Sequence, residues 1–237
     1  MQKLEILKQW IYESKSIVFF GGAGVSTESG IPDFRSVDGL YNQSFDYPPE
    51  KIISHSFFTA DPAYFFKFYR KKMMPLGFEP NVTHNTLARW EAEGRLSAVI
   101  TQNIDGLHQK AGSRHVLELH GSILRNYCMH CRKAYPAEYV RDNGDVPRCT
   151  CGGIVKPDVV LYEEQLDPRI VDASIEAISE ADMLIVAGTS LTVYPAAGLV
   201  DYYRGNRMVL INRDETPCDY KADLVFHESL GDIFHNL

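Results

Sequence analysis

The sequence contains no run of about 20 apolar residues, so no segment is expected to cross a membrane as a helix. Residues 1–7 include an acidic side chain and lack the apolar core of a signal peptide, which favours a cytoplasmic protein. Positive charge is also scarce, with 24 Lys and Arg against 31 Asp and Glu and a net charge of −7. This balance argues against direct nucleic-acid binding, which needs a dense basic patch, and it fits a cationic peptide partner.

Internal repeats and low-complexity segments are absent as well, and a content of 45% hydrophobic and 23% charged residues is typical of a globular protein. Short apolar runs bounded by glycine or polar residues predict buried parallel strands at residues 16–20, 97–100, 183–187, 208–211 and 222–226. Helical patterns lie between them at residues 4–11, 83–93, 168–181 and 195–203. We therefore predict an α/β fold with a doubly wound, Rossmann-like parallel sheet.

Two segments interrupt this alternation of strands and helices. Residues 36–79 are rich in aromatic side chains and irregular, and residues 121–156 contain paired cysteines but few other apolar residues. We predict that the first is a helical insertion and the second a zinc-binding module, and that together they form a small domain. The remaining residues, 1–35, 80–120 and 157–237, are predicted to form the sheet domain.

Four of the five cysteines form two close pairs, Cys128 with Cys131 and Cys149 with Cys151. Cytoplasmic thiols stay reduced, so pairs at this spacing indicate metal ligands rather than disulfides. Four thiolates complete a tetrahedral Zn²⁺ site, which makes the predicted zinc structural. The alternative, four unrelated thiols, is disfavoured by the spacing, and Cys218 is interpreted as an ordinary thiol.

A glycine loop, Gly22-Ala23-Gly24, follows the first predicted strand, and a helix is predicted after it. Backbone N–H groups at the start of a helix can bind phosphate. The dinucleotide fingerprint G-x-G-x-x-G is incomplete because Thr27 occupies the third glycine position, and a tight structural turn explains the loop equally well. The run Asp33-Phe34-Arg35 decides between these interpretations, because a simple turn does not require an acid, an aromatic ring and a guanidinium in succession.

The stretch from residue 22 to 35, GAGVSTESGIPDFR, resembles the opening signature of the sirtuins, bacterial and other NAD-dependent protein-lysine deacylases. Residues 101–108, TQNIDGLH, resemble the second signature of that family, and His120-Gly121 resembles the third. The cysteine pairs, residues 188–191 and residues 211–213 follow in family order, so the resemblance spans residues 16 to 234. It implies NAD as co-substrate, a structural zinc ion, and acyl-lysine proteins or peptides as partners.

The resemblance also implies a reaction. Nicotinamide leaves the ribose of NAD, the acyl oxygen of the modified lysine attacks C1′ of that ribose, and a base then activates a ribose hydroxyl for attack on the imidate carbon. The products are free lysine, nicotinamide and 2′-O-acyl-ADP-ribose. A base with a pKa near neutrality points to histidine, and His120 occupies the family position. The other histidines considered, His84, His108 and His115, are interpreted as packing residues.

Asn103 is the second residue to which the resemblance gives a catalytic role, although a turn containing Asn103 and Asp105 can also serve only its own backbone. Phe34 would cover the reaction centre. The NAD contacts implied by the resemblance are Gly22, Ala23, Gly24, Thr27, Asp33, Phe34, Arg35, Gln102, Asn103, Ile104, Asp105, His120, Gly188, Thr189, Ser190, Asn212, Asp232 and Ile233.

An acyl-lysine peptide is expected to enter the cleft between the two domains and to add as a strand between two edges. The implied peptide contacts are Val160, Leu161, Tyr162 and Val193. The family often has Phe-Gly-Glu where this chain has Tyr162-Glu163-Glu164, so the geometry of this loop does not follow from the resemblance. Sirtuins that remove acidic acyl groups carry a Tyr-x-x-Arg pair, and here Lys72 replaces the arginine after Tyr69, which predicts a preference for acetyl and other apolar acyl groups.

Two other functions compete with deacylation. An NAD-dependent mono-ADP-ribosyltransferase would use the same loop but would need His120 less, so substitution of this histidine distinguishes the two activities. A non-catalytic protein that binds through a zinc ribbon is the second alternative. The acidic charge and the complete set of site motifs argue against it.

Overall fold

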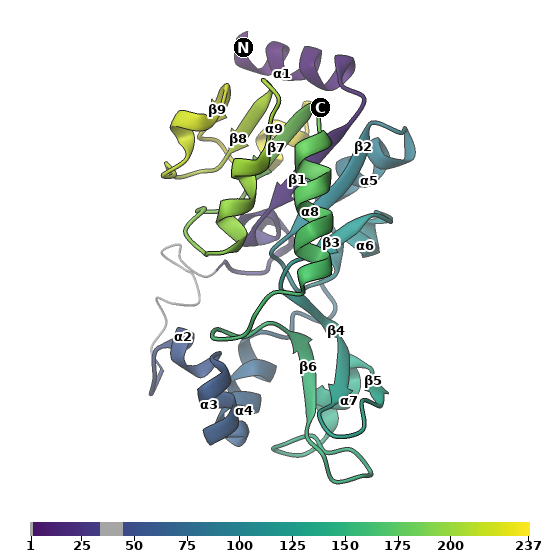
Figure 1. The fold of residues 1–237 in the computed structure, drawn as a ribbon, viewed down its shortest axis with the longest axis vertical. Helices are drawn as coiled ribbons and strands as arrows, with labels where there is room; N and C mark the ends of the chain where they lie inside the picture. Colours follow the sequence, from purple (N-terminus) through teal and green to yellow (C-terminus); the bar gives the residue numbers. More distant parts are fainter. Residues whose placement is uncertain (1, 34–44) are drawn as a thin grey trace.

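The computed structural model describes residues 2–33 and 45–237 and contains a six-stranded parallel sheet in the order β3-β2-β1-β7-β8-β9 (Figure 1). Taken in chain order, the six strands have the spatial order 3-2-1-4-5-6 that is typical of dinucleotide-binding folds. The predicted doubly wound sheet is therefore confirmed. The strands are β1 (Ile17–Gly21), β2 (Leu96–Thr101), β3 (Val116–Glu118), β7 (Met183–Ala187), β8 (Met208–Ile211) and β9 (Leu224–Phe226).

Helices cover both faces of this sheet because successive strand residues point to opposite sides. In β1, Ile17 and Phe19 join a core that includes residues of α1 (Gln2–Glu13), α5 (Val82–Ala92) and α9 (Leu230–Phe234). Val18 and Phe20 join a second core that includes residues of α8 (Pro168–Glu180) and η4 (Ala196–Tyr202). The central strands are buried on both faces, as their unbroken apolar runs predict.

Two of the predicted helices differ in kind from the α-helices expected. The segment at 195–203 is the 3₁₀ helix η4. In place of a helix after the glycine loop, the chain forms two short 3₁₀ turns, η1 (Ala23–Val25), which begins within the loop, and η2 (Thr27–Ser29). A longer helix cannot continue here, because Pro32 lacks an N–H group and disfavours helical backbone in the residue before it. The remaining short elements of the sheet domain are α6 (Leu107–Ala111) and η5 (Asp219–Lys221).

The small domain occupies the lower half of Figure 1 and combines both interrupting segments. A three-stranded antiparallel sheet is formed by β4 (Gly121–Cys128), β5 (Ala134–Tyr135) and β6 (Val155–Val159), with α7 (Ala137–Asp142) beside it. The helical insertion contributes α2 (Pro49–Ile52), α3 (His55–Ala60) and α4 (Pro62–Lys72). One core joins the two parts, with Phe58 and Phe66 in the same buried cluster as Val140 and Val155. The domain boundary predicted between residues 156 and 157 lies inside β6.

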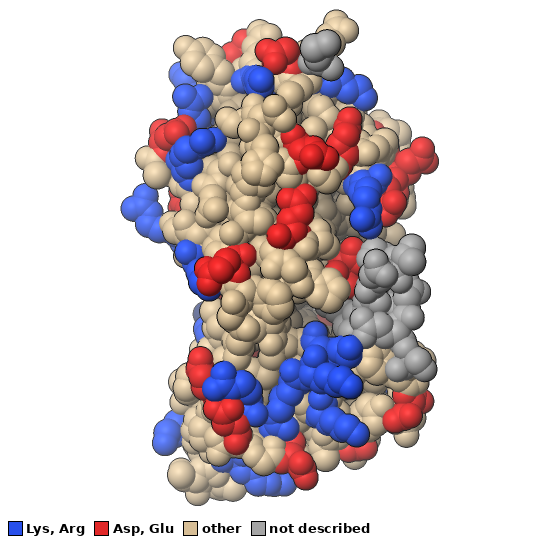
Figure 2. All heavy atoms as spheres, turned by 180° about the vertical axis from the view of Figure 1, so that it is seen from behind, with Lys and Arg blue, Asp and Glu red and all other residues tan. Residues whose placement is uncertain are grey.

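Charge is unevenly distributed over the surface. Lys and Arg side chains gather on one face of the small domain, whereas acidic and basic groups are mixed on the sheet domain (Figure 2). The last turn of α4 is basic, with Arg70, Lys71 and Lys72. Within the described residues, no helix is both long and apolar enough to span a bilayer.

Candidate active site

A cavity of about 630 Å³ lies between the two domains. Its walls include Gly22 after β1, Gln102 after β2 and Gly188 after β7, together with Val160 from the segment that follows β6. The first three residues follow the carboxyl ends of strands on either side of the point where the strand order reverses. Ligands of doubly wound sheets bind at this position.

The glycine loop packs directly on the end of β7. The Gly22 N–H donates to the Ala187 carbonyl at 3.1 Å, and the Gly24 N–H donates to the Gly188 carbonyl at 2.8 Å. A Cβ atom at Gly24 would lie 2.8 Å from the Gly188 Cα, which is too close for any side chain. Gly24 is therefore required for this contact between the two loops, and it leaves the loop backbone exposed to the cavity.

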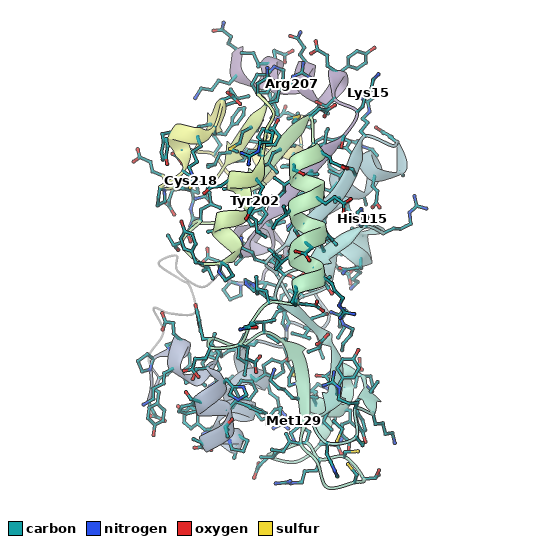
Figure 3. The ribbon with its side chains drawn as sticks, in the orientation of Figure 1. Lys15, His115, Met129, Tyr202, Arg207 and Cys218 are labelled. Atoms are coloured by element: carbon teal, nitrogen blue, oxygen red, sulfur yellow. The ribbon has the colours of Figure 1, made fainter. Side chains whose placement is uncertain are left out.

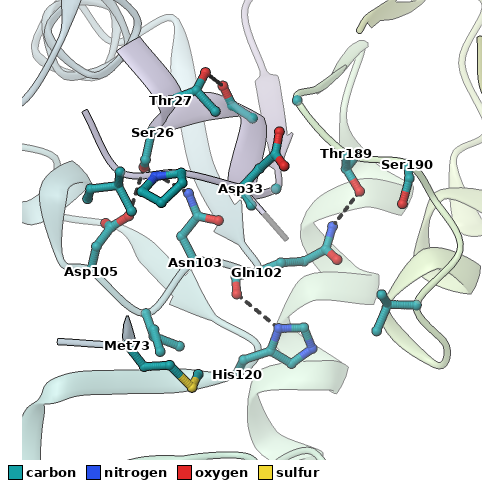
Figure 4. A pocket seen from close by; sticks show the side chains of 18 of the residues that line it. Ser26, Thr27, Asp33, Met73, Gln102, Asn103, Asp105, His120, Thr189 and Ser190 are labelled. Atoms are coloured by element: carbon teal, nitrogen blue, oxygen red, sulfur yellow. Dashed lines mark hydrogen bonds between the residues drawn. The ribbon is translucent and has the colours of Figure 1, made fainter. Parts of the chain in front are cut away.

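Three polar side chains from two loops form a hydrogen-bonded group at the cavity wall (Figure 4). The Ser26 hydroxyl donates to the Asp105 carboxylate at 2.7 Å, and the Asn103 amide donates to Ser26 Oγ at 3.0 Å. Burial raises the pKa of Asp105, while hydrogen bonds from the Leu107 N–H and Ser26 partly offset that rise. The side chain of Asn103 therefore does not bond only to the backbone of its own turn, because it donates to a residue 77 positions away.

His120 is held in one orientation by the loop that follows β2. Its Nδ1 lies 2.9 Å from the Gln102 carbonyl oxygen, which can only accept, so Nδ1 carries the proton and Nε2 of the neutral ring is free to accept one. Burial lowers the pKa of His120, and the bond to the Gln102 carbonyl opposes this shift only in part. The Gln102 amide donates to Thr189 Oγ1 at 3.0 Å and so connects this loop to the end of β7. A half-buried imidazole that stays neutral at pH 7 is suited to general-base catalysis.

The cavity brings together most of the predicted NAD residues. Phe34 and Arg35 lie outside the described residues, and Asp232 and Ile233 do not line the cavity. Ile233 is 6% exposed and packs in the sheet core because α9 turns its apolar face to the sheet, while Asp232 is exposed to solvent. The predicted residues that do line the cavity are Gly22, Ala23, Gly24, Thr27, Asp33, Gln102, Asn103, Ile104, Asp105, His120, Gly188, Thr189, Ser190 and Asn212.

Several residues that line the cavity or support its wall were not predicted from the sequence. Ser26 lies within the glycine-loop motif, but only the structure shows its bonds to two residues of the second motif. Asn81, the N-cap of α5, donates through its amide to the Val25 carbonyl at 2.8 Å and so supports the loop from behind. Near α9 the cavity is lined by Glu228, Ser229 and Leu230 rather than by the two residues expected there.

The predicted peptide contacts Val160, Leu161, Tyr162 and Val193 all line the cavity. The Val160 N–H donates to the His120 carbonyl at 3.0 Å. This bond connects the segment that is expected to bind the peptide with His120, the residue expected to act as the base. Lys72, Met73 and Met74, at the end of α4 and just after it, also line the cavity. Tyr69 is instead fully buried and stacks on Phe65 at 5.6 Å, so it does not reach the cavity.

The four paired cysteines meet in the small domain as predicted. All four Sγ atoms lie within 4.8 Å of one another, with Cys128 and Cys151 3.4 Å apart and Cys131 and Cys149 3.5 Å apart. Sulfur atoms of a tetrahedral zinc site are about 3.8 Å apart, so the cluster fits Zn²⁺ with a closed coordination shell. Cys218 lies in the sheet domain, at the other end of the molecule from Met129 beside the cluster (Figure 3).

A model of the Sir2 family matches residues 22–195. An NAD-dependent protein deacetylase of Clostridium acetobutylicum is 56% identical over 241 residues, which cover 100% of this chain and 98% of the relative. One of Clostridium perfringens is 56% identical over 235 residues, covering 98% and 96%.

Solved structures agree with the sequence relatives. A Sir2 complex with a deacetylated p53 peptide and 3′-O-acetyl ADP ribose has a TM-score of 0.91 at 36% identity and covers 99% of this chain and 96% of that one. A Sir2 complex with a p53 peptide and NAD⁺ has a TM-score of 0.88 at 37% identity, with 98% and 96% covered.

Proposed function

The chain belongs to the Sir2, or sirtuin, family, and we infer that it is an NAD-dependent protein deacetylase that transfers the acyl group to ADP-ribose and releases nicotinamide. One observation in the structure supports this activity above all. The glycine loop, the Ser26–Asn103–Asp105 group and the neutral imidazole of His120 line a single cavity at the point where the strand order reverses. A zinc ion held by the four cysteines would serve the fold, because four thiolates leave no open coordination position.

Residue roles follow from this geometry as proposals. NAD, when bound, would supply a ribose carbon that becomes electrophilic as nicotinamide leaves. The main-chain groups at residues 22–24 would hold its phosphates, and Asn103 and Asp105, fixed by Ser26, would orient the ribose and carboxamide. His120 accepts a ribose hydroxyl proton at Nε2, since Nδ1 is occupied by the Gln102 carbonyl.

We propose that the peptide lies along residues 160–162, between the sheet domain that holds NAD and the small domain. Its acyl group would then point toward the end of α4, where Lys72 and Met73 line the cavity. Lysine offers no bidentate contact to a carboxylate, and Tyr69 is buried away from the cavity, so acetyl and other apolar groups are favoured. A higher kcat/KM for succinyl-lysine than for acetyl-lysine peptide would overturn this preference.

The activity is tested by incubating the protein with NAD and an acetyl-lysine peptide and measuring nicotinamide and acetyl-ADP-ribose. Replacing the base, His120→Ala, should lower kcat/KM by about 100- to 10,000-fold, the usual contribution of a general base. The matched control is His235→Ala, because that histidine is exposed and does not line the cavity. Appearance of ADP-ribosylated peptide in place of deacetylated peptide would show a transferase instead.

Two further expectations concern the cell rather than the site. A cytoplasmic location and the absence of direct nucleic-acid binding remain predictions from composition. The Lys and Arg side chains gathered on the small domain make salt-dependent binding to DNA or RNA a useful check of the second (Figure 2).

A further inference from the structure

The loop after the peptide edge contains one residue with unusual backbone geometry. Glu163 has a φ of 74°, in the left-handed region that disfavours side chains other than glycine. It stands where the family often has glycine, in the run Tyr162-Glu163-Glu164. A glutamate in this conformation needs contacts that offset the strain, and its side chain makes them.

Those contacts are made with the first turn of α3. The Glu163 carboxylate accepts from the Ser56 N–H at 2.8 Å and from the Ser56 hydroxyl at 3.0 Å. The preceding helix N–H, that of His55, donates to the Tyr162 carbonyl at 3.0 Å, and the next one, that of Phe57, donates to the N-cap Ser54. The first N–H groups of a helix have no partner within the helix. Here the loop at residues 162–163, at the end of the proposed peptide-binding edge, supplies partners for two of these groups in α3.

The loop and the insertion are joined at further points. The Tyr162 N–H donates to the Ile53 carbonyl at 3.0 Å. The Glu164 carboxylate accepts from Lys156 at 3.1 Å and from the Leu161 N–H at 2.9 Å, and it lies 2.9 Å from Nδ1 of His55. Burial alone would raise the pKa of Glu164, but these bonds outweigh it and hold the pKa below its ordinary value.

We propose that Glu163 is a positioning residue that holds the peptide edge, residues 160–162, against the helical insertion and thereby sets the affinity for acyl-lysine peptides. The inference rests on the proposed function, in which the peptide lies along this edge. The insertion also contains the end of α4, which lines the cavity. The bonds between Glu163 and Ser56 therefore fix the distance between residues 160–162, which would bind the peptide, and the end of α4, which would contact its acyl group.

The test compares Glu163→Ala, Glu163→Gln and Glu163→Gly in steady-state assays with an acetyl-lysine peptide and NAD. Loss of both bonds in Glu163→Ala should raise KM for the peptide about tenfold, equivalent to about 1.4 kcal/mol. The kcat and the KM for NAD should stay within about twofold. Glu163→Gln keeps an acceptor oxygen and should stay close to the unmodified protein.

Glu163→Gly separates positioning from stability. Glycine tolerates the positive φ at position 163 and also lacks the two bonds to Ser56. The Tm of Glu163→Gly should therefore equal or exceed that of Glu163→Ala, while the KM for the peptide stays high. The control Glu50→Ala removes an exposed carboxylate from the same insertion and should change neither quantity. If Glu163→Ala does not fold, Ser56→Ala can replace it. This variant removes only the hydroxyl bond to Glu163 and should raise the KM for the peptide by a smaller factor.

An unchanged peptide KM in both Glu163→Ala and Glu163→Gly would overturn the inference, as would a change confined to kcat or to KM for NAD. Peptide Kd measured by fluorescence anisotropy requires no turnover. If the unmodified protein binds peptide but releases no nicotinamide, the proposed function fails while the positioning role is still tested by this Kd.

Discussion

Mild acid is expected to destabilise the fold through two histidines that touch in its interior. His84 of α5 and His108 of α6 are 0% and 1% exposed, with ring centroids 4.7 Å apart. Burial lowers the pKa of His84 to about 4. Burial, followed by repulsion from His84, lowers the pKa of His108 to about 3. Protonation of either ring is therefore much harder in the folded than in the unfolded chain.

The sign and size of the effect follow from these values. Both folded pKa values lie below the unfolded value of about 6.5, so stability is complete above pH 6.5 and is lost as the pH falls. From pH 7 to pH 5 the more difficult protonation of each histidine in the folded state costs roughly 2 kcal/mol of stability, and the pair costs about 4 kcal/mol. This is a large part of the 5–15 kcal/mol typical of a domain. The lowered pKa of His120 also reduces the stability of the fold as the pH falls. The pKa of Asp105 is raised by burial, so its protonation has the opposite effect on stability.

Urea unfolding of the protein and of His108→Phe at pH 7 and pH 5 measures this term. Neither ring nitrogen of His108 has a hydrogen-bond partner among the described residues, so phenylalanine keeps the ring packing and removes only the titration. The loss of stability between the two pH values should shrink by about 2 kcal/mol. The exposed control His235→Phe should leave it unchanged. An equal pH dependence in His108→Phe and in the unmodified protein would refute the reasoning.

Three further outcomes are expected. Chelation of zinc, or Cys149→Ser, should lower Tm by unfolding the small domain, as followed by circular dichroism; unchanged melting with the metal removed would contradict a structural role. The acid limb of kcat should lie below pH 6.5, because burial lowers the pKa of His120 and the ring must be neutral to accept a proton; a limb above pH 6.5 would exclude it as the base. Gly24→Ala should raise the Kd for NAD at least tenfold in calorimetry, since its Cβ would meet Gly188; tight binding would show that the two loops can separate.

The sequence predicted the parts of this molecule that depend on local pattern. Unbroken apolar runs located the central strands, and β7 and β8 coincide with the predicted ranges 183–187 and 208–211. The cysteine spacing predicted a metal cluster because a short turn brings together the two ligands of each pair, and the pairing of β4 with β6 then brings the two pairs together. The strands follow from burial, and each cysteine pair follows from the spacing of near neighbours in the chain.

Features that depend on distant contacts were not predictable in this way. The bond between Ser26 and Asn103 joins loops 77 residues apart, and periodicity carries no sign of it. The pattern of α9 does not indicate that Ile233 packs in the sheet core while Leu230 lines the cavity, and the predicted contact of Ile233 with NAD stays a prediction. The φ of 74° at Glu163 arises from a tertiary contact that no turn preference indicates.

The core shared by the helical insertion and the cysteine module limits how this protein can be recombined with its relatives. Phe58 and Phe66 bury their rings in the same cluster as Val140 and Val155, although residues 80–120 separate the two segments. A chimera that exchanged only residues 121–156 would set a foreign surface against those rings. Grafts between homologues must therefore carry both segments together, and engineering of substrate choice on this scaffold has to treat them as one part.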